Sequence, residues 1–243
     1  MANIFKELKK ISCVIVGFCS FFASAQSDVK GTMKTEIIQV KELGYALHIP
    51  KNTKKEKPLI VFLHGSGEKG SDIEKVKVHG PFKYIKTHKL DAYILAPQCP
   101  ENDYWDEEVL YRLIQKIQNE NNIDANRIYL TGLSMGGWGA WNLAFAKPDL
   151  FAALVPICGF VDRVPMIENC KIKNIPIRIF HGLLDDVVDV SYATTIYKKL
   201  KTCNPDVKLT IFDDANHDSW TRVYDNPEIY DWMLKQIKSQ KQQ

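Results

Sequence analysis

One serine has the neighbours that a catalytic nucleophile needs. Residues 130–137 read Leu-Thr-Gly-Leu-Ser-Met-Gly-Gly and contain the pattern G-x-S-x-G around Ser134. The pattern follows an apolar run typical of a strand and opens a stretch typical of a helix, a context that holds a serine on a tight, strained turn. Gly132 and Gly136 let neighbouring backbone approach without a side-chain clash. We therefore predict that Ser134 is a nucleophile, and that the helix N-terminus beneath it favours a developing negative charge.

A nucleophilic serine requires a general base, and that base requires an acid that orients it. Only two histidines, His181 and His217, follow Ser134 in the chain. His181 ends an apolar run, so we interpret it as a structural residue at a strand end. His217 lies in a polar loop after the last predicted strand, where parallel sheets place their reacting groups. We therefore predict His217 as the general base.

Three aspartates are candidates for the orienting acid. Asp185, Asp186 and Asp189 all follow the apolar run that ends at His181. Adjacent side chains point in different directions, so only one of Asp185 and Asp186 should reach His217. The residues alone do not decide between those two.

An oxyanion formed on attack by Ser134 needs two backbone N–H donors. Met135, directly after the nucleophile, is one predicted donor. The second should come from the loop at residues 64–68, His-Gly-Ser-Gly-Glu, which follows an earlier apolar strand. We favour the amide of Ser66, with Gly65 or Gly67 as alternatives. His64 precedes Ser134 in the chain, and we interpret it as organising this loop.

Tryptophans offer the only hints about the substrate. Trp105 lies in a polar loop after a strand end, where it could stack on a sugar or an aromatic acyl group. The alternative is a loop anchor packed on the body of the protein. Trp138 and Trp141 have spacings that favour core packing, and Trp220 is expected to support the His217 loop. Residues 159–174 could form a short lid, which the sequence leaves open.

Alternating apolar runs and amphipathic segments must position these residues. The predicted strands are residues 45–49, 59–63, 93–95, 127–130, 152–157, 175–180 and 207–212. Apolar side chains recur with helical spacing over residues 109–117 and 229–237. Strands that alternate with helices indicate an α/β fold with a mostly parallel twisted sheet and helices on both faces.

The N-terminus has the features of a secretory signal. Lysines at positions 6, 9 and 10 precede an apolar run at residues 11–22, which ends in Ala-Ser-Ala at 23–25. We predict a cleaved signal peptide at 1–25, a single catalytic domain at 26–243, and a secreted or periplasmic location. The run is short for a membrane span, so no stable membrane association is expected, although an uncleaved anchor is the alternative.

Composition excludes several other classes. The 243 residues are 45% hydrophobic and 25% charged, with a formal net charge of +3 that falls to +1 without the signal. No basic block indicates nucleic-acid binding. Four cysteines remain after the signal, at positions 99, 158, 170 and 203, and their pairing stays open. No C-x-x-C pair suggests a metal or redox site, no cofactor is expected, and a monomer or a dimer are equally open.

Four motifs together resemble one branch of the α/β-hydrolases. They are Phe-Leu-His-Gly-Ser-Gly-Glu at 62–68, Gly-Leu-Ser-Met-Gly-Gly at 132–137, Phe-His-Gly at 180–182 with Asp185, and His-Asp-Ser-Trp at 217–220. This is the polyhydroxybutyrate-depolymerase-like and prolyl-oligopeptidase-like branch, which includes feruloyl and acetyl xylan esterases. The motifs fall in the same order and the resemblance covers nearly the whole chain after the signal.

The resemblance carries expectations about the site and the reaction. In these relatives the acid lies four residues after the histidine of the His-Gly pair, which selects Asp185. Asp189 departs from the branch, where proline is common. The resemblance implies an α/β-hydrolase fold and hydrolysis of carboxylic esters through an acyl-enzyme, with acetyl or feruloyl groups on plant polysaccharide as expected substrates. A serine peptidase with the same triad and a catalytically silent binding protein are the alternatives.

Overall fold

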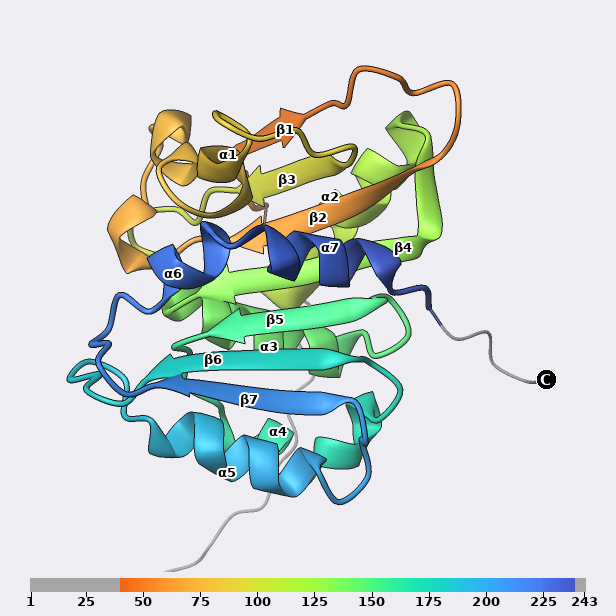
Figure 1. Ribbon diagram of the computed structural model, residues 1–243. Coiled ribbons are helices and arrows are strands. Elements are labelled where there is room, and N and C mark those ends of the chain that lie inside the picture. Colours follow the sequence, from red (N-terminus) through yellow and green to blue (C-terminus); the bar gives the residue numbers. More distant parts are fainter. Residues whose placement is uncertain (1–39, 239–243) are drawn as a thin grey trace, which may run out of the picture. The chain divides into compact units, whose positions relative to one another are not determined.

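A seven-stranded sheet forms the centre of the protein. The computed structural model describes residues 40–238, and the predicted signal peptide lies outside the described residues. The strands are β1 (Tyr45–His48), β2 (Lys57–Leu63), β3 (Tyr93–Pro97), β4 (Ile123–Leu133), β5 (Ala153–Ile157), β6 (Ile177–Gly182) and β7 (Val207–Phe212). Their order in the sheet is β1-β3-β2-β4-β5-β6-β7, and only the β1–β3 pairing is antiparallel (Figure 1). The predicted α/β fold with a mostly parallel sheet is confirmed.

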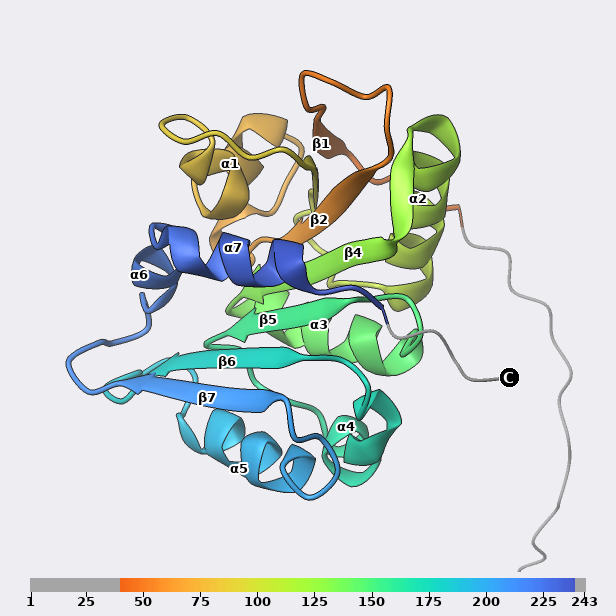
Figure 2. The same cartoon turned by 45° about the vertical axis from the view of Figure 1, so that its right-hand side comes forward.

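Helices cover both faces of this sheet. They are α1 (Gly80–Tyr84), α2 (Glu107–Glu120), α3 (Met135–Ala146), α4 (Arg163–Ile167), α5 (Ser191–Leu200), α6 (Trp220–Tyr224) and α7 (Pro227–Lys235), with 3-10 turns η1 (Ser66–Glu68), η2 (Ile73–Lys77) and η3 (Asn169–Ile172). Helices α1, α6 and α7 lie over one face, whereas α2, α3 and α5 lie over the other (Figures 1 and 2). None of the helices in the described part of the chain is long and apolar enough to cross a membrane.

The central strand β2 shows why the predicted strands do not alternate between apolar and polar residues. Its side chains point alternately to the two faces. Leu59, Val61 and Leu63 join the core beneath α2, α3 and α5, whereas Ile60 and Phe62 join the core beneath α1, α6 and α7. Because both faces are covered, every position from Leu59 to Leu63 must be apolar.

Several element boundaries differ from the sequence-based predictions by a few residues, as β4 and α7 illustrate. Strand β4 begins at Ile123, four residues before the predicted start at residue 127, because it continues across a register shift in its pairing with β2. Polar residues such as Asp124 and Asn126 hide this extension from a search for apolar runs. Helix α7 ends at Lys235, earlier than the predicted residue 237.

A disulfide joins the 3-10 turn η3 to the turn that follows α5. Cys170 in η3 is bonded to Cys203, which follows α5, whereas Cys99 and Cys158 are buried free thiols. The structure therefore selects one pairing among those that the sequence left open. The segment at residues 159–174 contains α4 and η3, and nothing in its contacts defines it as a lid.

Candidate active site

Ser134 sits at the sharp turn between β4 and α3. Its φ of 53° and ψ of −118° lie where side-chain-bearing residues are rarely found. A Cβ atom at Gly132 would collide with the carbonyl of Gly136, and one at Gly136 would collide with the carbonyl of Leu63. Both glycines are therefore required by backbone packing, and the strained turn holds the Ser134 side chain at the carboxyl edge of the sheet.

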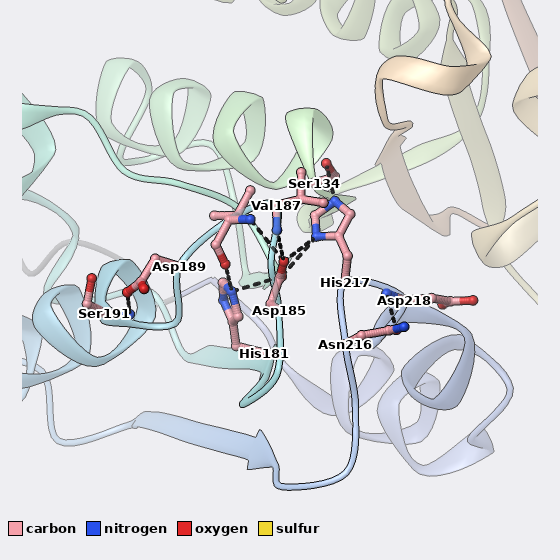
Figure 3. A network of polar contacts seen from close by, with 10 residues as sticks. Ser134, His181, Asp185, Val187, Asp189, Ser191, Asn216, His217 and Asp218 are labelled. Carbon is pink, nitrogen blue, oxygen red and sulfur yellow. Dashed lines mark hydrogen bonds and ion pairs between the residues drawn. The ribbon is translucent and has the colours of Figure 1, made fainter.

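Three side chains far apart in the chain meet at this edge. His217 Nε2 lies 2.9 Å from Ser134 Oγ, and His217 Nδ1 lies 2.9 Å from both carboxylate oxygens of Asp185 (Figure 3). The carboxylate makes Nδ1 the protonated nitrogen, so Nε2 is free to accept the hydroxyl proton of Ser134. The side chain of Asp185 is fully buried and that of His217 is 18% exposed. This is the geometry of a nucleophile, a base and an orienting acid.

The carboxylate of Asp185 is held from several directions. Its Oδ1 accepts hydrogen bonds from the amides of Val187 at 3.0 Å and Val188 at 2.9 Å. Its Oδ2 lies 3.1 Å from Nε2 of His181, which also donates to the Val188 carbonyl at 2.8 Å (Figure 3). Asp186, by contrast, is exposed. Of the two adjacent aspartates, the structure thus brings Asp185 to His217.

The loop of residue 217 is fixed on both sides. Asn216 Oδ1 accepts from the amide of Asp218, and Asp218 Oδ1 in turn accepts from the amide of Thr221 at the start of α6. The ring of Trp220 meets the ring of His217 edge to face, with centroids 5.3 Å apart. The expected support of this loop by Trp220 is confirmed.

The two predicted oxyanion donors are both first residues of a helix. Ser66 opens η1 and Met135 opens α3. The first N–H groups of a helix have no partner within it, so both amides are available to a ligand. A side chain at Gly65 would press against Leu133, so the loop lies close to the end of β4. That the amides of Ser66 and Met135 donate to the same substrate oxyanion stays a prediction.

His64 organises the loop at residues 64–68, as expected. Its Nδ1 donates to the Gly65 carbonyl at 2.6 Å, and its Nε2 accepts from the amide of Cys99 at 3.0 Å. The side chain is 1% exposed. Burial lowers the pKa of His64 to about 4, which keeps the ring neutral and preserves both hydrogen bonds.

The prediction that Trp105 stacks on substrate is wrong. The residue is only 5% exposed and belongs to the core beneath α2 and α3. Its ring packs against His64 with centroids 4.8 Å apart, and a side chain at Gly139 would collide with it. Trp105 therefore anchors its loop, which was the alternative interpretation, and the exposed ring in this loop is that of Tyr104.

The other tryptophans of α3 divide between two environments. Trp141 is 1% exposed and confirms the expected core packing. Trp138 is only half-buried and contacts Tyr104 on one side and Phe160 on the other. The spacing of Trp138 and Trp141 on the helix predicted core packing for both, so the sequence did not indicate that Trp138 is partly exposed. The signals available in the sequence are an aromatic residue next to Trp105 and another in the loop that follows β5.

One group of side chains has the composition of a metal site. Ligand atoms of Cys158, Asp185 and His217 lie within 4.8 Å of one another. A metal there would displace the proton that His217 Nδ1 shares with Asp185. Burial also raises the pKa of the Cys158 thiol to about 12, so a thiolate ligand would be costly to form. The donor set fits a hydrogen-bonded triad better than a metal centre.

Known proteins that are similar to this chain include esterases, in agreement with the geometry of the site. The phospholipase/carboxylesterase family matches residues 106–226, which contain Ser134, Asp185 and His217. A probable feruloyl esterase C of Aspergillus flavus is 25% identical over 183 residues, which cover 71% of this chain and 66% of that protein. A bifunctional acetylxylan esterase/xylanase of Neocallimastix patriciarum is 31% identical over 156 residues, covering 60% of this chain and 22% of that protein.

Solved structures show the same architecture. A thermostable esterase superimposes with a TM-score of 0.71 at 34% identity, over 80% of this chain and 59% of that one. An acylaminoacyl peptidase of Pyrococcus horikoshii superimposes with a TM-score of 0.65 at 17% identity, over 86% of this chain and 41% of that one, and shares the fold alone. The chain thus spans less than two thirds of the length of each of these similar proteins.

Proposed function

This chain belongs to the esterase branch of the α/β-hydrolases, and from that premise we propose that it is an exported serine carboxylesterase. The observation that carries the proposal is the position of His217, whose two ring nitrogens lie 2.9 Å from Ser134 Oγ and from the Asp185 carboxylate. Such a chain of hydrogen bonds serves to take a proton from a hydroxyl and to return it to a leaving group.

The reaction proceeds in two halves. In the first, His217 accepts the proton of Ser134 as its oxygen attacks the ester carbonyl, and Asp185 stabilises the imidazolium. The amides of Met135 and Ser66 hold the tetrahedral oxyanion, and His217 then protonates the leaving alcohol. In the second, His217 activates a water that releases the acid from the acyl-enzyme.

Export is supported by two observations of different kinds. The basic, apolar and Ala-Ser-Ala segments of residues 1–25 have the order of a secretory signal. The bond between Cys170 and Cys203 is of a kind that persists in oxidising compartments. We expect the substrate to be a small ester or an acylated polysaccharide, with acetyl or feruloyl as the acyl group.

A fluorophosphonate probe and a panel of simple esters test the proposal. The wild-type protein should bind the probe covalently and hydrolyse 4-nitrophenyl acetate and butyrate. Ser134→Ala should do neither while unfolding at a similar urea concentration. Absence of both labelling and hydrolysis in folded wild-type protein would favour a binding protein. Cleavage of peptides with no cleavage of esters would favour a peptidase.

A further inference from the structure

Four aromatic side chains form a continuous array at the edge of the sheet that carries Ser134. The array consists of Tyr104, Trp138, Phe160 and Tyr192. Ring centroids are 6.0 Å apart for Tyr104 and Trp138, 5.4 Å for the stacked rings of Trp138 and Phe160, and 6.3 Å for Phe160 and Tyr192. The members come from the loop after β3, from α3, from the loop after β5 and from the start of α5. Loops after parallel strands are where such sheets bind ligands.

The array begins beside the nucleophile. Trp138 follows Ser134 by one helical turn, and its amide donates to the Ser134 carbonyl at 3.0 Å. Ser134 is the N-cap of α3, so Trp138 lies one turn farther along the helix, about 5.4 Å along its axis. Tyr192, at the other end, follows the loop that carries Asp185. The array therefore starts one helical turn from the nucleophile and extends to the helix that follows the Asp185 loop.

The indole of Trp138 is held in one orientation, whereas two other rings of the array are exposed to solvent. Asp162 accepts hydrogen bonds from Trp138 Nε1 at 2.7 Å and from Asn142 Nδ2 at 2.9 Å, which sets the orientation of the indole. Gly159 has no space for a side chain against the backbone of Trp138. Yet the Tyr104 residue is 65% exposed and Tyr192 is 40% exposed. Exposed rings of this kind are not needed to fill the core, and they suit recognition of a ligand.

We propose that this array binds the acyl part of the substrate and selects acyl groups that carry an aromatic ring. The inference rests on the proposed esterase function. An acetyl group is too small to extend from Ser134 across four rings. Sugar hydroxyls would need free polar partners, but Asp162 is already bonded and the ammonium of Lys69 lies over the Tyr104 ring at 4.6 Å. An aryl group gains instead from apolar burial and ring stacking.

Methyl esters that share one alcohol isolate the effect of the acyl group. We expect wild-type protein to hydrolyse methyl cinnamate with a higher kcat/KM than methyl butyrate. Tyr104→Ala and Trp138→Leu should lower the ratio of kcat/KM for methyl cinnamate to kcat/KM for methyl butyrate by about tenfold, the size of a lost ring contact. Tyr111→Ala is the matched control, because Lys147 likewise lies over that ring, at 4.0 Å, but on α2.

The outcomes separate this proposal from the esterase function itself. Hydrolysis of methyl butyrate with an unchanged cinnamate-to-butyrate ratio in both array variants would overturn the array proposal and leave the esterase intact. Loss confined to esters of sugar alcohols would overturn it in favour of carbohydrate binding. Absence of both fluorophosphonate labelling and ester hydrolysis in folded wild-type protein would overturn the proposed function, and the array proposal with it.

A separate observation concerns the buried contact between His181 and Asp185. Nε2 of His181 lies 3.1 Å from Asp185 Oδ2 and 2.8 Å from the Val188 carbonyl, and the two side chains are 1% and 0% exposed. Both neighbours are acceptors, so Nε2 carries the proton. Nδ1 is buried without a hydrogen-bond partner among the described residues. The geometry assigns His181 as a positioning residue that donates to the Asp185 carboxylate, beyond its position at a strand end.

Two substitutions separate positioning from a purely structural role. With the fraction of active protein counted by fluorophosphonate labelling, His181→Phe should lower kcat by about tenfold with KM within twofold, because one charge-assisted donor to Asp185 is lost. His181→Gln, whose amide can donate, should recover most of this loss, and the acid limb of the kcat/KM profile should move only in His181→Phe. Equal kcat per labelled site in both variants and in wild type would overturn the assignment.

Discussion

The backbone at Ser134 is strained, and the cost of this strain can be measured as a difference in unfolding free energy between two variants. Its φ of 53° and ψ of −118° cost a residue with a Cβ atom about 1–3 kcal/mol, and glycine escapes this cost. Glycine instead loses about 0.5–1 kcal/mol more conformational entropy on folding than alanine does. The balance predicts that Ser134→Gly is more stable than Ser134→Ala by about 1 kcal/mol, and by about 2.5 kcal/mol at most.

Urea unfolding followed by tryptophan fluorescence gives this difference directly. Both variants lack the nucleophile and the hydrogen bond to His217, so they differ only by one methyl group. For a domain of this size, 1 kcal/mol corresponds to a rise in melting temperature of roughly 2–4 °C. The same pair at Ser191, the first residue of α5 with an ordinary negative φ, is the control and should favour alanine. If Ser134→Gly proves no more stable than Ser134→Ala, the strained turn does not exist in solution.

Three further outcomes follow from the site and its surroundings. Asp185→Asn should lower kcat by roughly three to four orders of magnitude, as expected when the acid that orients the base is lost, whereas Asp186→Asn should stay within about twofold of wild type in the same ester assay. Burial holds the pKa of His64 near 4, below its unfolded value of about 6.5, so its contribution to stability is present above pH 6.5 and is lost as the pH falls toward 4. Urea unfolding should show a loss of about 3 kcal/mol over that interval, and the loss should shrink in His64→Gln. Reducing the disulfide between Cys170 and Cys203, which lie 33 residues apart, should lower the unfolding free energy by about 3–4 kcal/mol; an unchanged melting temperature with dithiothreitol would contradict this.

Short-range patterns in the sequence were enough to predict the nucleophile turn, most of the strands and the catalytic histidine candidate. The turn around Ser134 is encoded by glycines within two residues of it, because backbone conformation depends on immediate neighbours. The strand runs were recognisable because a strand covered on both faces must be apolar throughout. Chain order after Ser134 left only two histidines, and position in a polar loop separated His217 from His181.

Tertiary packing decided the rest, because it depends on residues remote in sequence. Trp105 and Tyr104 are adjacent in one polar loop, yet His64 and Gly139 bury the first ring and leave the second exposed. Nothing near either residue carries that distinction. The choice between Asp185 and Asp186, which the residues alone left open, and the bond between Cys170 and Cys203 likewise follow from how separate segments meet. Short-range backbone preferences can be read along a chain, but which side of a loop is covered is settled only when distant segments pack against it.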